Sequence, residues 1–465
     1  MRMGTFHVDR VQYPVGQGGF HSMTIHIGSQ RFSVVVDCGG GKEEHRKVYV
    51  DAFATGNKKH DVLAISHLDW DHIGGIGSLA RSGVQFANVF LPHVDEHVYA
   101  RWMTTRLAYA MSDIDVGEIG EAVDYLGGLY GGRYGRPVRV VPGDGGDLPP
   151  GDEPPDRHET SREHPPVSGL LAEDIQEQLE RITARQGFPA KRSLTFSFLD
   201  WVLRFYSWEW TCPDEITQIW KLPVLQQLAD SLRALVRNGF QDDTTALIAD
   251  VVDALKAKVS ADDATSAIKH VRTGRVSKQK AMTIKTLLGK LYEASPTLEN
   301  YNDASLCVYA GPSPRGVNVP HTGFVRRIET KGQRVNLHPD RAAVSLRAVG
   351  WMHTGDAHLD APRLGQFAEH YRIELPLTSV LVLPHHGSRR SYGPNLTEFD
   401  ALAAEMPKRP LFVAAAQPDH QRYGHPHSAV VARCLDHGVL RIVDDRPGSL
   451  LEDSVCVRGF HYWFV

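Results

Sequence analysis

The sequence predicts an α+β fold, in which one αββα core is interrupted by a large, mostly helical insertion. Two observations lead to this prediction. Apolar runs of strand length occur in both the first and the last part of the chain, and helical periodicity fills most of the chain between them. We therefore expect residues 1–93 and 300–465 to form the two parts of the core, and residues 94–299 to form the insertion.

Each predicted strand is a short apolar run that ends at a glycine turn or a polar residue. The runs lie at 31–37, 61–66, 87–92, 305–310, 345–352, 379–384 and 411–416. Helical patterns alternate with the later runs, at 361–370, 396–406 and 427–437. Two further runs, 137–144 and 200–207, have strand character inside the helical block.

The composition is that of a globular protein. The formal net charge of −4 argues against a protein that binds nucleic acid through its overall charge, but it leaves room for a local basic groove. The five cysteines are odd in number and have no zinc-ribbon spacing, which favours a reducing compartment. We see no signal peptide and no apolar run of membrane-spanning length, so we expect a cytoplasmic protein without a membrane partner.

One short segment carries most of the chemical information. In HLDWDHIGG (67–75), four potential metal ligands occur within six residues, directly after the predicted strand 61–66: His67, Asp69, Asp71 and His72. They can converge on one point because the chain turns at the end of the strand, and the two glycines allow a tight entry into the next helix. The alternative is a capped helix start with solvated carboxylates.

Two later segments have the form needed to complete a metal site. HTGD (353–356) and LPHHGS (383–388) each follow a predicted strand, and they would present Asp356 and His385 at the same sheet edge. Each segment alone is weak evidence, because such turns are often only loops. Together, the three segments predict an open site for two metal ions.

These segments belong to a longer series of motifs. The series is PVGQGGF (14–20), VVVDCGG (34–40), SHLDWDHIGG (66–75), NDASLCVYA (302–310), HTGDA (353–357), LPHHGSRRS (383–391) and RYGHPH (422–427). It resembles the metallo-β-lactamase superfamily and, within it, the soluble domain of ComEC-type competence proteins. The resemblance covers about 1–93 and 300–465, together with the strands near 137–144 and 200–207. It implies a four-layer αββα metallo-β-lactamase sandwich.

The resemblance also implies a ligand set. It assigns His67 and Asp69 to one ion, and Asp71, His72 and His385 to the other, with Asp356 bridging. Asp37 would support the ligand loop from behind. We prefer His385 to His386 because it directly follows the strand. Three histidines and three carboxylates suit two divalent ions, either Zn²⁺ or Mn²⁺.

The sequence departs from the family pattern at three points. Gly19 replaces an aspartate in the early turn, and Asp69 stands where most of the wider superfamily has histidine, a change that the subgroup shares. The usual separate histidine between the signature and the TGD element is not evident. His321 and Asn302 are the candidates for it.

For the reaction, we assign catalytic roles to Asp71 and His427. We assign substrate binding to His386, Ser388, Arg389 and His425. The alternative for Ser388 and Arg389 is an ordinary polar turn. The alternative for His425 and His427 is a structural role at a helix start.

The resemblance favours a hydrolase acting on DNA or RNA, in which the two metal ions activate a hydroxide. Nine Lys and Arg residues between 256 and 290, against two aspartates, could track a phosphate backbone, although a solvated helix face explains them as well. Two alternatives remain. The protein could hydrolyse a small phosphoester or cyclic nucleotide, or it could be a hydrolase subunit of a larger assembly, possibly in defence, that docks a protein partner through the insertion.

Overall fold

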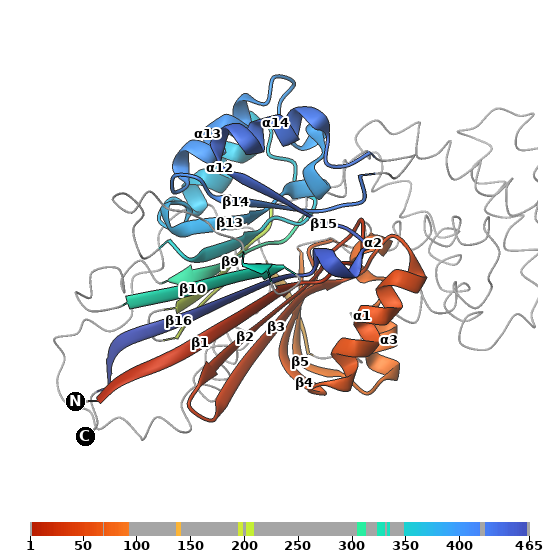
Figure 1. Ribbon diagram of the computed structural model, residues 1–465, viewed down its shortest axis with the longest axis vertical. Helices are drawn as coiled ribbons and strands as arrows, with labels where there is room; N and C mark the ends of the chain where they lie inside the picture. The colour runs from red at the N-terminus through yellow and green to blue at the C-terminus, as the bar shows by residue number, and fades with distance from the viewer. Residues whose placement is uncertain are drawn as a thin grey trace, which may run out of the picture. The chain divides into compact units, whose positions relative to one another are not determined.

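The computed structural model describes ten segments of the chain (Figure 1). They are 2–67, 69–92, 136–140, 194–198, 201–208, 305–312, 323–330, 333–334, 348–418 and 424–462. The chain divides into two compact units, of which the first comprises Met1–His93, Gly135–Glu209 and Asn302–Val465, and the second Val94–Tyr134 and Trp210–Tyr301. Every described segment belongs to the first unit. The predicted helical insertion, with its basic stretch 256–290, lies mostly outside the described residues.

The first sheet has nine strands in the order β11-β10-β16-β1-β2-β3-β4-β5-β6. Its strands are β1 (Arg2–Gln12), β2 (Phe20–Ile27), β3 (Gln30–Cys38), β4 (Lys59–Ala64), β5 (Gln85–Pro92), β6 (Arg136–Val140), β10 (Gly323–Thr330), β11 (Gln333–Arg334) and β16 (Leu451–Tyr462). The pairs from β3 to β6 are parallel and the others are antiparallel. The first and last strands of the chain, β1 and β16, therefore pair with each other inside this sheet.

The second sheet has seven strands in the order β15-β14-β13-β12-β9-β8-β7. They are β7 (Leu194–Phe198), β8 (Trp201–Tyr206), β9 (Cys307–Pro312), β12 (Gly350–His353), β13 (Thr378–Val382), β14 (Leu411–Ala415) and β15 (Val439–Val443). The pairs from β12 to β15 are parallel, whereas β7, β8 and β9 pair antiparallel. Both sheets are therefore mixed, and they occur in a chain that combines strands and helices as predicted.

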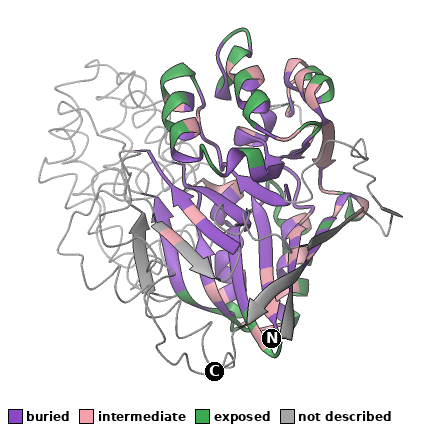
Figure 2. Ribbon diagram, turned by 90° about the vertical axis from the view of Figure 1, so that its left-hand side faces the viewer, coloured by how far each residue is buried: buried purple, intermediate pink, exposed green. Residues whose placement is uncertain are grey.

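The two sheets face each other across an apolar core. Phe6, Val34 and Val36 of the first sheet share one buried cluster with Trp201 and Val308 of the second. Figure 2 shows that the strands are buried over most of their described length. Each large apolar side chain that is fully buried in this way stabilises the fold by about 1.5–3 kcal/mol.

One buried cation also joins the sheets. Arg10 of β1 is fully buried and forms an ion pair with Asp453 of β16, with 2.6 Å between Nη2 and Oδ2. It donates hydrogen bonds to the carbonyl oxygens of Ala310 and Val349, on the side of the second sheet. Because a buried charge is tolerated only when it is paired and hydrogen-bonded, these contacts explain how Arg10 can lie between the two sheets.

Helices cover the described sheets. The helices α12 (Ala361–His370), α13 (Thr397–Glu405) and α14 (Ser428–His437) share a second buried cluster with the strands of the second sheet. Their positions agree with the helices predicted at 361–370, 396–406 and 427–437. The helices α1 (Glu43–Thr55), α2 (Trp70–Ile73) and α3 (Ile76–Arg81) lie between strands of the first sheet in the chain. No helix among the described residues has both the length and the apolar character needed to cross a bilayer.

Candidate metal site

Loops that follow three strands bring the candidate ligands together. His67 follows β4, Asp356 follows β12, and His385 and His386 follow β13. The signature then continues into the short helix α2, which carries Asp71 and His72. These side chains therefore meet at the carboxyl ends of strands from both sheets.

The geometry forms two groups of three potential ligands. The first is His67, His72 and Asp356, and the second is Asp71, His72 and His386. Within each group, one ligand atom from every residue lies within 4.8 Å of the others. His72 belongs to both groups, so the groups adjoin.

Asp356 lies between the histidines of both groups. Its Oδ2 is 3.6 Å from His67 Nε2, and its Oδ1 is 3.3 Å from His72 Nε2 and 3.5 Å from His386 Nε2. His386 Nε2 is in turn 3.2 Å from Asp71 Oδ2. One oxygen of Asp356 thus faces His67, and the other faces His72 and His386.

Two buried atoms at the centre of this cluster indicate that it fits a cation. His67 Nε2 and Asp356 Oδ1 have no hydrogen-bond partner among the described residues, although both are buried. Buried polar atoms are almost always satisfied. A divalent cation between the imidazole nitrogens and the carboxylates would satisfy both atoms, and the donor set is one that such ions accept.

Hydrogen bonds behind the site orient the histidine rings. His72 Nδ1 donates to Asp37 Oδ2 at 2.8 Å, and His386 Nδ1 donates to the carbonyl oxygen of Ala415 at 2.8 Å. His67 Nδ1 lies 3.1 Å from Ser66 Oγ. Each Nδ1 is therefore engaged, which leaves each Nε2 to face the cluster, as a metal-binding imidazole requires.

Asp37 lies directly behind His72. It is fully buried, and its carboxylate also accepts hydrogen bonds from the Ser66 N–H at 2.7 Å and the Ser66 hydroxyl at 2.6 Å. Its backbone has φ of +56°, a region that aspartate tolerates better than most residues. Ser66, which the sequence analysis did not select, thus connects Asp37 to the histidines.

The histidines and carboxylates of the cluster stabilise one another's charged forms. Burial opposes ionisation of Asp356, but the four surrounding histidines outweigh it and hold the pKa of Asp356 well below its usual value. Burial likewise opposes the charged form of His72, yet Asp356, Asp37 and Asp71 raise the pKa of His72 well above its usual value. The pKa of His386 is raised for the same reason, against the effect of its burial. Protons and a metal ion therefore compete for these nitrogens.

The structure distinguishes the two consecutive histidines. His385 and His386 have left-handed backbones, with φ of +48° and +58°, and Gly387 follows with φ of +84°. His386 is 4% exposed and belongs to the group with Asp71 and His72. His385 does not belong to either group, and its side chain is 24% exposed, with Nε2 3.8 Å from Asp356 Oδ2. The close group therefore contains His386 and not His385, the residue that the sequence analysis preferred as a ligand.

Asp69 lies at the margin of the cluster. Its Oδ2 is 3.8 Å from His67 Nε2, and its side chain is 33% exposed. It is not a member of either close group. His321 and Asn302, the candidates for the missing ligand, lie outside the described residues.

Glycines allow the loops to approach the signature closely. A Cβ at Gly39 would lie 2.1 Å from the Asp71 carbonyl carbon, so no side chain fits there. A Cβ at Gly19 would lie 2.7 Å from Asp37 Oδ2 and 2.8 Å from His72 Nδ1. A side chain at position 19 would therefore displace the Asp37–His72 pair from the positions that it has in this structure.

The remaining predicted site residues surround the cluster. Ser388 is buried, and its hydroxyl oxygen accepts a hydrogen bond from the Arg390 N–H, a capping role. Arg389 is exposed and donates to the Pro394 carbonyl oxygen at 2.7 Å. His427 is the N-cap of α14, where its Nδ1 accepts from the Ala429 N–H. The capping of these turns agrees with the structural alternatives for Ser388 and His427, while their substrate roles stay predictions.

His425 lies beside His385, with 5.6 Å between ring centroids. Burial lowers the pKa of His425 to about 4, and the neighbouring histidines add to this effect. His353, which the sequence analysis did not select, is also buried close by, and its Nδ1 accepts from the Gly355 N–H. Its signal in the sequence was its place at the start of the HTGD segment.

Comparison with known families supports the broader part of the resemblance. The metallo-beta-lactamase superfamily matches residues 18–169. The matched stretch contains Asp37 and all four potential ligands of the signature, and it suggests a metal-dependent hydrolase. No curated protein sequence matches the chain. The ComEC-type subgroup therefore stays a prediction.

Proposed function

We propose that the protein is a two-metal phosphodiesterase that hydrolyses DNA or RNA. The observation that carries the proposal is the pair of adjoining ligand groups, which share His72 and have the two oxygens of Asp356 directed to different histidines. An imidazole nitrogen has one lone pair and binds one ion, whereas a carboxylate can bridge two. Asp356 is therefore the bridging ligand in this proposal.

The distances suggest how the other ligands divide. His67 would join Asp356 Oδ2 at the first ion, with Asp69 beside it. Asp71, His72 and His386 would hold the second ion with Asp356 Oδ1. This mixture of imidazole and carboxylate ligands suits Zn²⁺ or Mn²⁺.

When bound, divalent ions activate water as a nucleophile at neutral pH and stabilise negative charge on a phosphoryl oxygen. The residues of the chain would orient the substrate. His385 and His425 are partly exposed beside the cluster, and His425 is neutral at pH 7 because its pKa is lowered to about 4. A neutral imidazole can donate one N–H to a phosphate oxygen without repelling the bound ions.

A polynucleotide also needs cations for its phosphates. Arg389 and Arg390 are exposed and follow His386 closely in the chain, so they could contact the phosphates that flank a scissile bond. The net charge of −4 means that such contacts must be local. The resemblance to ComEC-type proteins supports the same substrate class.

The test is a cleavage assay with purified protein in Mn²⁺ or Zn²⁺, on single-stranded, linear and circular DNA and on RNA. We expect metal-dependent cleavage that is lost in Asp71→Ala and Asp356→Ala chains. It should persist in an Asp436→Ala chain, because Asp436 is an exposed carboxylate of α14. No cleavage by metal-loaded protein would contradict the nuclease proposal. Hydrolysis of bis-p-nitrophenyl phosphate alone would then indicate a small phosphoester substrate.

A further inference from the structure

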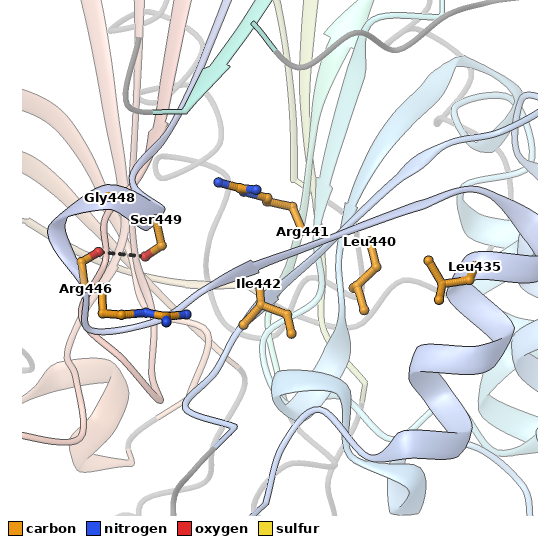
Figure 3. Close-up of a pocket in the computed structure, with 7 residues that line it drawn as sticks. All are labelled: Leu435, Leu440, Arg441, Ile442, Arg446, Gly448 and Ser449. Carbon is orange, nitrogen blue, oxygen red and sulfur yellow. Dashed lines mark hydrogen bonds between the residues drawn. The ribbon is translucent and has the colours of Figure 1, made fainter. Parts of the chain in front are cut away.

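A hollow on the surface follows the outermost strand of the second sheet. It is lined by Leu435 of α14, by Leu440, Arg441 and Ile442 of β15, and by Arg446, Gly448 and Ser449 of the turn that follows (Figure 3). These elements lie before, along and after β15 in the chain. The hollow therefore borders the middle of β15 and the segments on either side of it in the chain.

The lining residues come from both faces of the sheet. Leu440 and Ile442 pack on the buried cluster that includes α14, whereas Val439 and Val443 pack on the cluster of Trp351 and Val380. Because side chains alternate along a strand, Arg441 projects with Val439 and Val443, opposite Leu440 and Ile442 (Figure 3). A hollow that includes both sets must lie at the edge of the strand.

That edge has backbone groups available for pairing. β15 is the terminal strand of the sheet, and β14 is the only strand that pairs with it among the described residues. On the β14 side, the Val439 N–H donates to the carbonyl oxygen of Pro410, and the Val443 carbonyl oxygen accepts from the N–H of Ala416. In an extended strand, the N–H and the C=O of one residue point to the same side, and the next residue points its two groups to the opposite side. Val439 and Val443 point theirs toward β14, so Leu440 and Ile442 point theirs away from it. An edge of this kind can accept a further strand.

The side chains of the hollow define the chemistry of an occupant. Leu435 is 62% exposed and contributes apolar surface to the hollow. The Nε atom of Arg441 is buried without a hydrogen-bond partner, and no carboxylate in the described part of the chain pairs with this guanidinium. By contrast, Arg446 pairs with Asp444. The hollow thus combines an open strand edge, apolar surface and one cation that lacks an anion.

We propose that β15 binds an extended acidic peptide of a partner protein, which adds to the second sheet as a strand. Its backbone would pair with Leu440 and Ile442, its apolar side chains would contact Leu435 and Ile442, and a carboxylate would pair with Arg441. This surface is distinct from the metal cluster, and its role does not depend on the proposed hydrolysis.

The test uses a phage-displayed library of random peptides of about eight residues, somewhat longer than the five residues of β15, selected on the full-length chain. We expect enriched peptides with alternating apolar residues and one Asp or Glu. A synthetic enriched peptide, measured by fluorescence anisotropy, should bind an Arg441→Glu chain about tenfold more weakly than wild type. It should bind an Arg372→Glu chain as wild type does, because Arg372 is an exposed arginine outside the hollow.

A proline at position 442 provides a second test. It removes an N–H that points away from β14, so the pairing of β14 with β15 should survive while strand addition is lost. Unchanged circular dichroism would show that this chain folds, and if it does not fold, the Arg441→Glu chain still decides. Peptide binding that is insensitive to Arg441→Glu, or no enrichment at all, would overturn the proposal. A dimer of the chain that Arg441→Glu dissociates would also overturn it, because the edge would then hold a second copy.

Discussion

Replacing Asp37 by asparagine tests whether the buried hydrogen bonds behind the metal cluster determine metal affinity. In the structure, the Asp37 carboxylate accepts three hydrogen bonds, two from Ser66 and one from His72 Nδ1. An asparagine has one acceptor oxygen, and its amide group would direct N–H donors at one of these partners. The substitution also removes the negative charge that raises the basicity of His72.

The expected loss follows from the geometry. Without the carboxylate, His72 Nδ1 keeps its 3.2 Å contact with Ser66 Oγ, but the ring is held less firmly and its Nε2 is a weaker ligand. Changes to the partner of a metal-binding histidine cost about 10–100-fold in metal affinity. That range corresponds to about 1.4–2.7 kcal/mol. The Asp37→Asn chain also loses a buried hydrogen bond to a charged group, so its free energy of unfolding should fall by about 1.5–3 kcal/mol without metal.

The affinity would be measured by competition between the protein and a chromophoric zinc chelator. Asp61→Asn is the matched control, because Asp61 also accepts from both the N–H and the hydroxyl of a serine, Ser33, on the neighbouring parallel strand. Asp61 has no histidine of the metal cluster among its partners. We expect both variants to be destabilised and only Asp37→Asn to bind zinc more weakly. Equal zinc affinities in the two variants would refute the orienting role of Asp37.

Three further predictions concern other positions of the chain. His386→Ala should weaken zinc binding more than tenfold, which corresponds to about 1.4 kcal/mol, whereas His385→Ala should weaken it less. Calorimetric titration of the two variants with zinc measures this order, and the opposite order would favour His385 as the ligand. Gly19→Ala should lower zinc affinity, because its Cβ would lie 2.7 Å from Asp37 Oδ2, and a crystal structure of the variant with that pair unmoved would contradict this reasoning. Burial lowers the pKa of His370 to about 2 in the folded chain. Below the ordinary histidine pKa, the unfolded chain therefore binds a proton at His370 that the folded chain does not bind, and the free energy of unfolding falls as the pH falls. Urea unfolding near pH 8 and near pH 5 should show that His370→Gln removes about 2 kcal/mol of this acid destabilisation, and equal pH dependence in the two chains would exclude His370 as its source.

Of the described strands of the second sheet, β8, β9, β12, β13 and β14 could be predicted from their apolar runs, as could the helices beside them, whereas β7 and β15 were not predicted. β13 and β14 are continuous apolar runs, and both are buried along their full length. In contrast, β1 and β16 were not predicted. The buried face of each strand carries apolar residues, but that of β1 also carries Arg10 and that of β16 also carries Asp453. In the sequence these two charged residues indicate exposed positions, and only the structure shows that they are buried as an ion pair. Polar residues that are satisfied by distant partners hide the alternation on which strand prediction depends.

The sequence predicted which segments would meet at the site, but not which of two adjacent histidines would face the cluster. The four potential ligands of the signature lie within six residues of the chain, so they are near one another in any compact fold and could be selected from the sequence alone. The choice between His385 and His386 was different in kind. It depends on left-handed backbones at both residues and on the carbonyl oxygen of Ala415, which β14 places beside the His386 ring. A ring's direction is set by partners that are far away in sequence, and therefore only the tertiary structure could decide it.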